Sequence, residues 1–442
     1  MKNATDHFIE YLIQKQTAVT PSVLSKAKAC LADYIAVTEA GAHAMKDAWE
    51  TFLHHAEPGK APLIGYGMKT DARTACLVNG YNAHCLELDD GQRFAMLHLG
   101  ASVITALLSA ASVNNISTDD FLRGTIMGYE AACRLAVAIQ PGHKKKGFHA
   151  AATCGTVGAA VAVAFALRMN ATQLKTVLSA AVASAAGMLE IQEQDSQLKP
   201  YNLGRAAMDG FTAATMGFTN MQGSNDMLDG DRGFFKLFTD EYDVEKLTVQ
   251  TDYFEMERIY VKPYAACRHC HSAIEAALAL RDKIKPQDIS RILVKTYKLA
   301  IKGHDHIVIK SSPSAKLSIP YSVAAALILG QAGLEAFAEK TVARHDILEL
   351  VSKVTVEEAP CPTTLPPDAR YATVVVTAKN GEEFSYSVDY AKGAPENPMS
   401  REDMTDKIQS LLAYAECDGK LVGQCRALLD DDMDIGLLQS LL

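Results

Sequence analysis

Residues 371–390 read YATVVVTAKNGEEFSYSVDY, and this stretch decides that the chain is not helical throughout. β-Branched and aromatic residues are dense in both halves, residues 371–379 and residues 382–390. Asn380 and Gly381 lie between the halves, and Asn-Gly between two strand-like runs is the strongest short signal for a β-hairpin. The stretch therefore predicts two paired strands.

The residues around this hairpin extend the prediction to an α+β domain. Residues 289–297 and 351–357 have a similar strand-like composition, and residues 263–283 and 318–331 have the pattern of helices. We therefore expect an α+β domain over residues 251–394, which is a common domain size.

The rest of the chain has the pattern of helices. Residues 22–40 carry apolar side chains near the 3.6-residue period, between Pro21 at the start and Gly41 at the end. Similar patterns cover residues 70–86, 101–113, 119–139, 153–168, 171–188 and 206–216, and a capping box at residues 400–403 begins further helices. The fold class predicted is mainly α: a large all-helical domain (residues 1–250 and 395–442) with an inserted, smaller α+β lid domain (residues 251–394).

Composition and charge favour a globular protein with a small ligand over one that binds nucleic acids or acidic membranes. The 442 residues are 48% hydrophobic and 21% charged, and the net charge is −9, which argues against nucleic-acid partners and acidic membranes. Residues 1–7 show no signal core, and no apolar run approaches the length that spans a bilayer. We expect a cytoplasmic protein whose ten cysteines are reduced thiols.

Residues 260–271, YVKPYAACRHCH, hold the densest group of chemically active side chains. Lys262 and Pro263 precede Arg268 and His271, and an apolar helical pattern follows. Because a helix start offers free N–H groups, we expect cations to converge there and bind a small, highly charged anion.

Other chemistries fit this stretch poorly. Cys267 to His271 match the Cys-x-x-Cys-His haem-attachment pattern, but that chemistry requires an exported chain. A zinc site lacks a second ligand pair, and a thioredoxin-like redox pair lacks its βαβ setting. No glycine-rich nucleotide fingerprint occurs, so a nucleotide cofactor has no support in the sequence.

Four further segments compete for a functional role. Glu87, Asp89 and Asp90 precede His98 and could set its tautomer, although a solvated acidic loop explains them equally well. His149 stands at a helix start, where the dipole keeps an imidazole neutral; an incidental histidine in a basic loop is the alternative. Lys199 and Arg205 repeat the pairing of cations with a helix start, and Tyr321 is either a core residue or a proton donor.

These segments in this order resemble the MmgE/PrpD family, which includes 2-methylcitrate dehydratase, cis-aconitate decarboxylase and iminodisuccinate epimerase. The resemblance covers nearly the whole chain and rests on residues 84–90 (HCLELDD), 98–100 (HLG), 147–156 (GFHAAATCGT), 199–207 (KPYNLGRAA), 262–271 (KPYAACRHCH) and 317–321 (LSIPY). It implies a helical domain, a smaller lid, a cleft between them and a homodimer that needs no cofactor.

The resemblance also implies site residues. It makes Lys199 and Lys262 active-site cations and His98 or His149 the base, with Tyr321 or the other histidine as the acid. The further candidates are Glu87 and His271 as polar site residues, Asp89 and Gly91 as substrate contacts, and Arg205 and Arg268 as carboxylate grips.

Departures from the family's pattern limit what the resemblance implies about substrate. Gly91 stands where the related decarboxylases and dehydratases have threonine, and Leu99 and Ala150 replace prolines. The expected function is a cofactor-independent lyase, a dehydratase or decarboxylase, that abstracts a proton beside a carboxylate of a small di- or tricarboxylate. An epimerase of an iminodisuccinate-like substrate and a non-catalytic carboxylate-binding protein are the alternatives.

Overall fold

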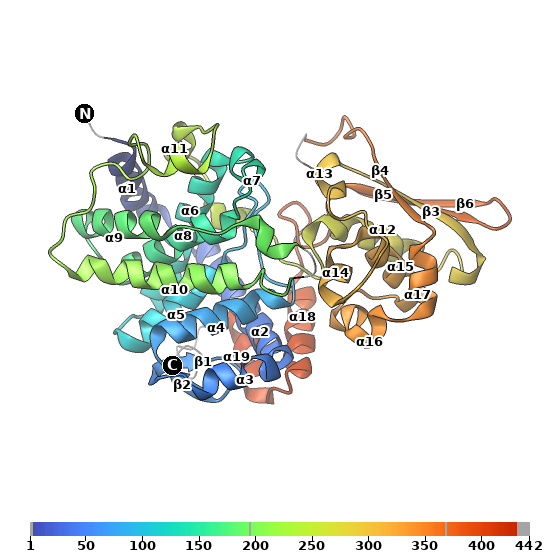
Figure 1. The fold of residues 1–442 in the computed structure, drawn as a ribbon, viewed down its shortest axis with the longest axis horizontal. Helices are drawn as coiled ribbons and strands as arrows, with labels where there is room; N and C mark the ends of the chain where they lie inside the picture. The colour runs from blue at the N-terminus through green and yellow to red at the C-terminus, as the bar shows by residue number, and fades with distance from the viewer. Residues whose placement is uncertain (1–2, 194–195, 367–368, 431–442) are drawn as a thin grey trace.

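A computed structural model describes residues 3–193, 196–366 and 369–430 of the chain. It has two lobes, a larger helical one and a smaller one that contains a sheet (Figure 1). The fold is mainly helical with a small mixed sheet in the C-terminal region, as the sequence predicts. The residues at which the two domains divide stay a prediction.

The larger lobe is built around α8 (Ala150–Ala166), every residue of which is buried. Alanine and glycine dominate α8, so neighbouring helices approach it closely on all sides. Its neighbours are α5 (Gly100–Val113), α6 (Thr118–Ile139), α9 (Ala171–Ser184) and α10 (Tyr201–Thr215). The remaining helices before residue 250 are α1 (Ala4–Lys15), α2 (Pro21–Ala44), α3 (Lys46–His54), α4 (Ala72–Cys85), α7 (Gly142–Lys145) and α11 (Phe234–Phe238).

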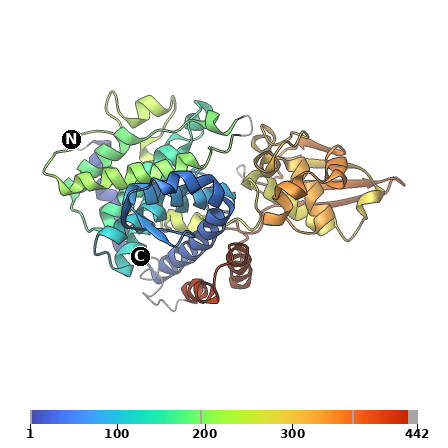
Figure 2. The ribbon, with the colours of Figure 1, turned by 60° about the horizontal axis from the view of Figure 1, so that its bottom comes forward.

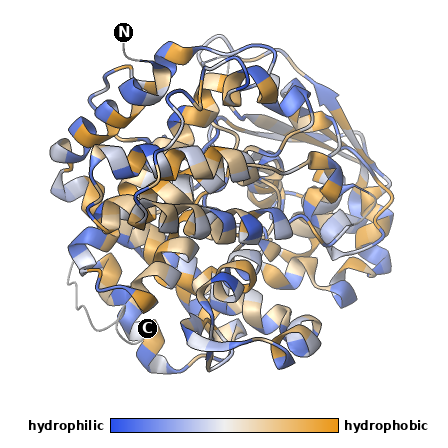
Figure 3. Cartoon of the chain, turned by 60° about the vertical axis from the view of Figure 1, so that its left-hand side comes forward, coloured by the Kyte–Doolittle hydropathy of each residue, from blue (hydrophilic) through white to orange (hydrophobic). Residues whose placement is uncertain are grey.

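Polar and hydrophobic residues alternate along the outer helices of this lobe (Figure 3). The lobe also contains an antiparallel pair of strands, β1 (Pro58–Leu63) and β2 (Met68–Thr70), which the sequence analysis did not predict. Both strands are short, and β1 contains proline and glycine, so their strand signal is weak.

Helices α4 and α10 cross at two glycines. A Cβ on Gly204 would lie 2.2 Å from the carbonyl oxygen of Leu77, and one on Gly80 would lie 2.7 Å from the Cα of Gly204. Only glycine allows backbones this close. The crossing brings the end of α4 and the start of α10 together, and both ends carry site residues.

The smaller lobe contains a four-stranded sheet in the order β4-β3-β5-β6. β3 (Ile289–Thr296) pairs parallel with β4 (Val354–Glu358) and antiparallel with β5 (Ala372–Ala378), which pairs with β6 (Glu383–Val388). The Asn380-Gly381 hairpin is confirmed, with Gly381 at a φ of +90°. The lobe's helices are α12 (His271–Leu280), α13 (Lys298–Ile301), α14 (Ser312–Leu317), α15 (Ile319–Leu329), α16 (Glu339–Val342) and α17 (His345–Val351).

The prediction that Pro263 begins a helix is wrong. The backbone N–H of Ala265 donates to Ala332, and that of Cys267 donates to Lys316, so these groups pair across the fold instead of along a helix. The helix α12 begins only at His271. Lys262 is therefore held at the site by its side chain, and not at a helix start.

The C-terminal helices return to the larger lobe (Figure 2). α18 (Arg401–Tyr414) and α19 (Gly419–Leu429) pack against α2. The capping box predicted at residues 400–403 is confirmed, because Ser400 and Asp403 cap each other's backbone N–H groups. Within the described ranges, no helix has the length and apolar character needed to cross a bilayer.

Candidate active site

The loop that follows α4 carries a strained acidic residue. Glu87 has a φ of 56°, in the left-handed region that non-glycine residues rarely adopt. Such strain is retained where the surrounding contacts over-determine it, often at functional sites. The contacts here are ionic.

Two lysines from distant segments hold Glu87 and Asp89. Lys199, just before α10, pairs with one carboxylate oxygen of Glu87. Lys262 Nζ lies 3.0 Å from the other oxygen of Glu87 and 3.3 Å from Asp89 Oδ1, and its side chain is fully buried. The structure thus brings four predicted site residues into one contact network.

The pKa values of this network favour the charged forms. Burial alone would raise the pKa of Glu87, but the ammonium groups of Lys199 and Lys262 outweigh it and hold that pKa well below its usual value. The pKa of Asp89 is lowered in the same way, against burial, by the neighbouring imidazoles and Lys262. Burial would lower the pKa of Lys262, but Glu87 and Asp89 raise it. Two negative and two positive charges therefore balance.

His84 completes the network, and the sequence analysis gave it no role. Its Nδ1 lies 2.8 Å from Asp89 Oδ2, and its Nε2 lies 3.5 Å from Glu87 Oε1. That buried Nε2 has no hydrogen-bond partner among the described residues. The signal available was its place at the head of the segment that contains Glu87 and Asp89.

The backbone partner of His98 fixes its tautomer. Its Nδ1 lies 2.7 Å from the carbonyl oxygen of Asp90, which only accepts, so Nδ1 carries the proton and Nε2 carries the lone pair. Burial lowers the pKa of His98 to about 3, although Asp89 opposes the shift. His98 is therefore a neutral imidazole with a lone pair available at neutral pH.

Asp90 holds the segment around His98 in place through hydrogen bonds and is not part of the ionic network. Its carboxylate accepts hydrogen bonds from the Tyr129 hydroxyl at 2.6 Å and from the Gly100 N–H at 2.9 Å, where α5 begins. Burial raises the pKa of Asp90 to about 6.

His149 is the opposite tautomer of His98. It precedes α8, as predicted, and the side-chain amide of Asn202 donates to its Nδ1 at 3.2 Å. Its proton is therefore on Nε2. Burial, followed by Lys199, lowers the pKa of His149 well below its usual value, and the fields of His84 and His98 contribute. The sequence predicts this lowering from the helix dipole, whereas its largest cause in the structure is burial.

A cavity of about 770 Å³ lies between the lobes. The larger lobe contributes Glu87 and Lys199, and the smaller lobe contributes Lys316 and His306. Lys316 was not predicted, although it directly precedes the segment that contains Tyr321. Its ammonium lies 3.5 Å from the carbonyl oxygen of Cys85, and only 8% of the residue is exposed.

Lys316 differs from the other two lysines because no carboxylate in the described part of the chain forms an ion pair with it. Burial lowers its pKa, while Cys85 and Glu87 oppose the shift. A buried cation without a counter-ion is costly, so the cavity favours an anion at this position.

The remaining predicted residues are occupied by contacts within the protein. Tyr321 donates its hydroxyl to Ala336 at 2.6 Å and is fully buried in the smaller lobe. Gly91 pairs its backbone N–H and carbonyl with Tyr260, and a Cβ there would lie 2.4 Å from the Tyr260 hydroxyl. Arg205 binds the Ala186 carbonyl and lies 3.4 Å from Asp209.

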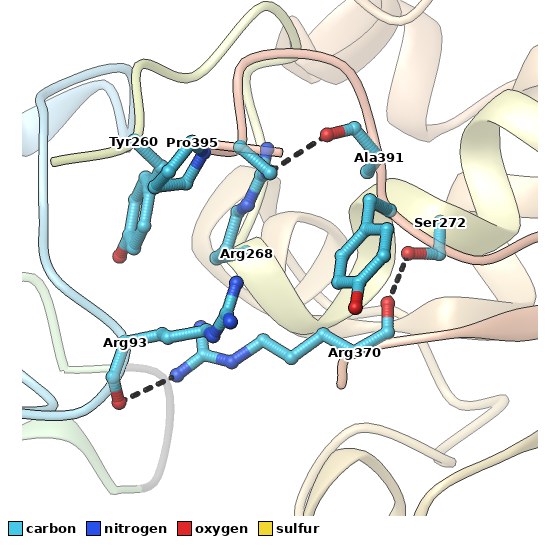
Figure 4. Close-up of a pocket in the computed structure, with 9 residues that line it drawn as sticks. Arg93, Tyr260, Arg268, Ser272, Arg370, Ala391 and Pro395 are labelled. Carbon is cyan, nitrogen blue, oxygen red and sulfur yellow. Dashed lines mark hydrogen bonds between the residues drawn. The ribbon is translucent and has the colours of Figure 1, made fainter. Parts of the chain in front are cut away.

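Arg268 and His271 support each other behind Tyr260. Arg268 donates to the carbonyl oxygens of Ala391 and Lys392 and to His271 Nδ1, and its guanidinium stacks 4.9 Å from the Tyr260 ring (Figure 4). Burial lowers the pKa of Arg268 to about 10 and that of His271 well below its usual value. These contacts occupy both side chains, and the hollow beside them, about 20 Å³, has room for little more than a water molecule.

Three donor groups of the site are also of the kind that hold metals. His84, Asp89 and His98 offer ligand atoms within 4.8 Å of one another. However, the ammonium of Lys262 lies 3.3 Å from Asp89, and His98 Nδ1 already donates to Asp90. A divalent cation would meet that ammonium at close range, so the arrangement favours an anion over a metal.

Known proteins are similar to this chain over most of its length. Human cis-aconitate decarboxylase is 28% identical over 351 residues, covering 76% of this chain and 72% of that protein. A cis-aconitate decarboxylase-like protein from Aspergillus oryzae is 24% identical over 425 residues, covering 90% and 88%. Residues 7–247 match the MmgE/PrpD N-terminal domain and residues 264–420 match the MmgE/PrpD C-terminal domain. The chain therefore belongs to the MmgE/PrpD family.

Proposed function

We propose that this protein is a cofactor-independent lyase that acts on a small di- or tricarboxylate, releasing water or carbon dioxide. The observation that carries the proposal is the neutral imidazole of His98 beside the ion pairs of Lys199 and Lys262, which border a cavity where Lys316 pairs with no carboxylate of the described residues. The similarity to cis-aconitate decarboxylases supports a carboxylate substrate.

Charge balance favours an anionic substrate. Glu87 and Asp89 offset Lys199 and Lys262, whereas Lys316 pairs with no carboxylate of the described residues and can bind a substrate carboxylate. Lys199 also faces the cavity and can contact a second carboxylate. Two ammonium groups on facing lobes suit a substrate that carries at least two carboxylates.

The two histidine tautomers suit a proton transfer in which one group accepts and the other donates. In a dehydration, His98 Nε2 takes the proton beside a carboxylate, and His149 Nε2–H protonates the departing hydroxyl group. In a decarboxylation, loss of carbon dioxide leaves the electron pair on carbon, and an imidazole N–H returns a proton to it. In both cases negative charge builds up on the substrate, and Lys199 and Lys262 stabilise it.

Our scheme gives Tyr321 no part, because its hydroxyl donates to the carbonyl oxygen of Ala336 within the smaller lobe. We assign the acid to His149 instead. Gly91 and Arg268 are positioning residues in this scheme, since their polar groups are occupied by the protein itself.

The alternative is an epimerase, which one observation favours. Two neutral imidazoles of opposite tautomer could remove a proton from one face of a carbon and return one to the other face. An iminodisuccinate-like dicarboxylate would then be the substrate.

A panel of candidate substrates tests the proposal. Citrate, 2-methylcitrate, cis-aconitate and iminodisuccinate are each incubated with the purified protein, and products are identified by NMR and mass spectrometry. A lyase gives an unsaturated or decarboxylated acid from at least one of them. Binding of these anions without any turnover would instead support a non-catalytic carboxylate-binding protein.

A further inference from the structure

A second pair of reactive side chains lies outside the proposed acid–base groups. Cys267 Sγ lies 3.3 Å from His304 Nε2. His304 Nδ1 lies 3.1 Å from the carbonyl oxygen of Lys302, which only accepts, so the proton is on Nδ1 and Nε2 faces the thiol with its lone pair. The thiol proton can therefore pass to the imidazole, leaving a thiolate beside an imidazolium.

The surroundings favour this charge separation. Burial alone would raise the pKa of Cys267, but His304 outweighs it and lowers that pKa to about 6. Burial would lower the pKa of His304, and Cys267 raises it. By contrast, burial raises the pKa of Cys85 and Cys154 to about 12.

Titratable groups from several elements face this pair. Lys199 supports the thiolate and Glu87 opposes it. Lys144 of α7 lies nearby, and the ring of His269 lies 5.0 Å from that of His304. The other two groups are Tyr297, which follows β3, and Arg370, which precedes β5.

A second thiol lies one turn further along the chain. The N–H of Cys270 donates to the carbonyl oxygen of Cys267 at 2.8 Å, closing a 3₁₀ turn. The Cys267 N–H and the Cys270 thiol both point to the carbonyl oxygen of Lys316, at 2.8 and 4.0 Å. A closed i to i+3 turn holds its end Cα atoms within about 7 Å, which is the range that a disulfide spans.

The two thiols also differ in access. Cys267 is partly exposed, whereas Cys270 is fully buried. This is the arrangement of an attacking thiolate and a resolving thiol.

We propose that Cys267 and Cys270 form a peroxide-sensitive dithiol in which His304 activates Cys267. The Cys267 thiolate attacks one peroxide oxygen, so that an S–O bond forms and the O–O bond breaks, and the other oxygen leaves as hydroxide, which the His304 imidazolium protonates to water. The Cys270 thiol then attacks the sulfenic sulfur, an S–S bond forms, and the hydroxyl leaves as a second water. A thiol reductant restores both thiols.

The first test measures thiol reactivity in the full-length protein. Iodoacetamide labelling is followed by peptide mass spectrometry between pH 5 and 8.5. Cys361 is the internal reference, because its thiol faces a backbone carbonyl oxygen at 3.5 Å, whereas the Cys267 thiol faces an imidazole. Cys267 should label at least tenfold faster than Cys361 at pH 6.5, with a half-maximal rate near pH 6. H304Q should remove this advantage, while H345Q, at an exposed histidine of the same lobe, should keep it.

The second test measures oxidation. One equivalent of hydrogen peroxide should lower the mass of the Cys267–Cys270 peptide by two hydrogens, and dithiothreitol should reverse the change. C270S should stop at a sulfenic acid that dimedone traps. Equal labelling of Cys267 and Cys361 in the wild type, or oxidation of Cys267 without a disulfide, would overturn the proposal. Neither readout depends on turnover, so failure here leaves the proposed lyase untouched.

Discussion

At the scale of single residues, the site depends on which nitrogen of each histidine carries a proton. Backbone and amide partners set both tautomers: the Asp90 carbonyl holds the proton of His98 on Nδ1, and Asn202 leaves the proton of His149 on Nε2. These assignments give one imidazole a free lone pair and the other a free N–H, so the pair can act without titrating.

The pH dependence of kcat/KM tests the state of His98. Because burial lowers its pKa to about 3, the imidazole stays neutral and active as a base well below the ordinary histidine range. After correction for substrate ionisation, kcat/KM should be flat between pH 5 and 8. Asp90 has a pKa of about 6, so its titration would change kcat/KM in the same pH range as an ordinary histidine. The D90N variant removes that titration and so distinguishes Asp90 from His98. A limb near pH 6.5 that persists in D90N would contradict this account of His98.

Lys316 should contribute mainly to substrate binding. K316M removes a site ammonium that pairs with no carboxylate of the described residues, so KM should rise about tenfold or more, as expected for loss of a charged hydrogen bond, with a smaller change in kcat. K353M, at a half-buried lysine of the same lobe that pairs with Glu349, is the matched control and should leave KM unchanged. An unaltered KM in K316M would exclude Lys316 from the binding site.

The sequence predicts part of this site and misses part for physical reasons. Glu87 and Lys199 meet because α4, which ends before Glu87, crosses α10, which begins after Lys199, and Lys262 reaches them from a non-helical segment. Lys316 was missed because a lone lysine has no local signal, and its importance comes from the absence of a nearby counter-ion. Likewise, the sequence predicts that Arg268 binds a substrate carboxylate. In the fold its guanidinium donates to the carbonyl oxygens of Ala391 and Lys392, which lie more than a hundred residues away in sequence.

At the scale of elements, the crossing of α4 and α10 sets the distance between Glu87 and Lys199. Helical periodicity predicts both helices, since their apolar positions recur along one face. The predicted helix at Pro263 fails because its backbone groups find partners far away in sequence, at Ala332 and Lys316. Local patterns cannot show such partners.

G204A should be strongly destabilising. Its Cβ would lie 2.2 Å from the Leu77 carbonyl oxygen, so the helices must separate, and we expect a loss of about 1–3 kcal/mol in the free energy of unfolding. Activity should fall with it, since Lys199 moves away from Glu87. G423A is the control: it lies within α19, a Cβ there meets nothing within 4 Å, and alanine favours a helix by about 1 kcal/mol. Thermal and urea unfolding measure both, and equal stabilities would contradict a close crossing.

At the scale of the whole molecule, the C-terminal helix α18 reaches back to the site. Lys407 Nζ lies 2.6 Å from Asp33 Oδ1 in α2 and 2.8 Å from the carbonyl oxygen of Leu88. Leu88 stands between Glu87 and Asp89, so α18 holds the acidic loop from behind.

K407M should destabilise the protein and disturb the loop. Removing one partner of a buried ion pair costs about 3–5 kcal/mol, whereas replacing both with apolar residues is often neutral. The double variant D33L/K407M should therefore regain most of the stability, measured by urea unfolding. Its kcat/KM should stay about tenfold or more below wild type, because the Leu88 carbonyl is no longer held. Full recovery of activity in the double variant would show that α18 does not position the loop.

The predicted homodimer also belongs to this scale and stays a prediction. Large apolar side chains are exposed on the larger lobe, including Met188, Leu198 and Phe218 at 68%, 55% and 61%. Light scattering coupled to size-exclusion chromatography measures the assembly, and a monomer mass across the micromolar range would contradict it.

The central claim is that His98 exchanges a proton with the substrate beside a carboxylate. The most direct test incubates the protein with the substrate panel in deuterated water and follows the carbon-bound hydrogens by NMR. The account predicts deuterium in the substrate or product with the wild type and with the control H345Q. It predicts a loss of about a hundredfold or more with H98Q. Incorporation at the wild-type rate in H98Q, or none in any protein with any substrate, would contradict it.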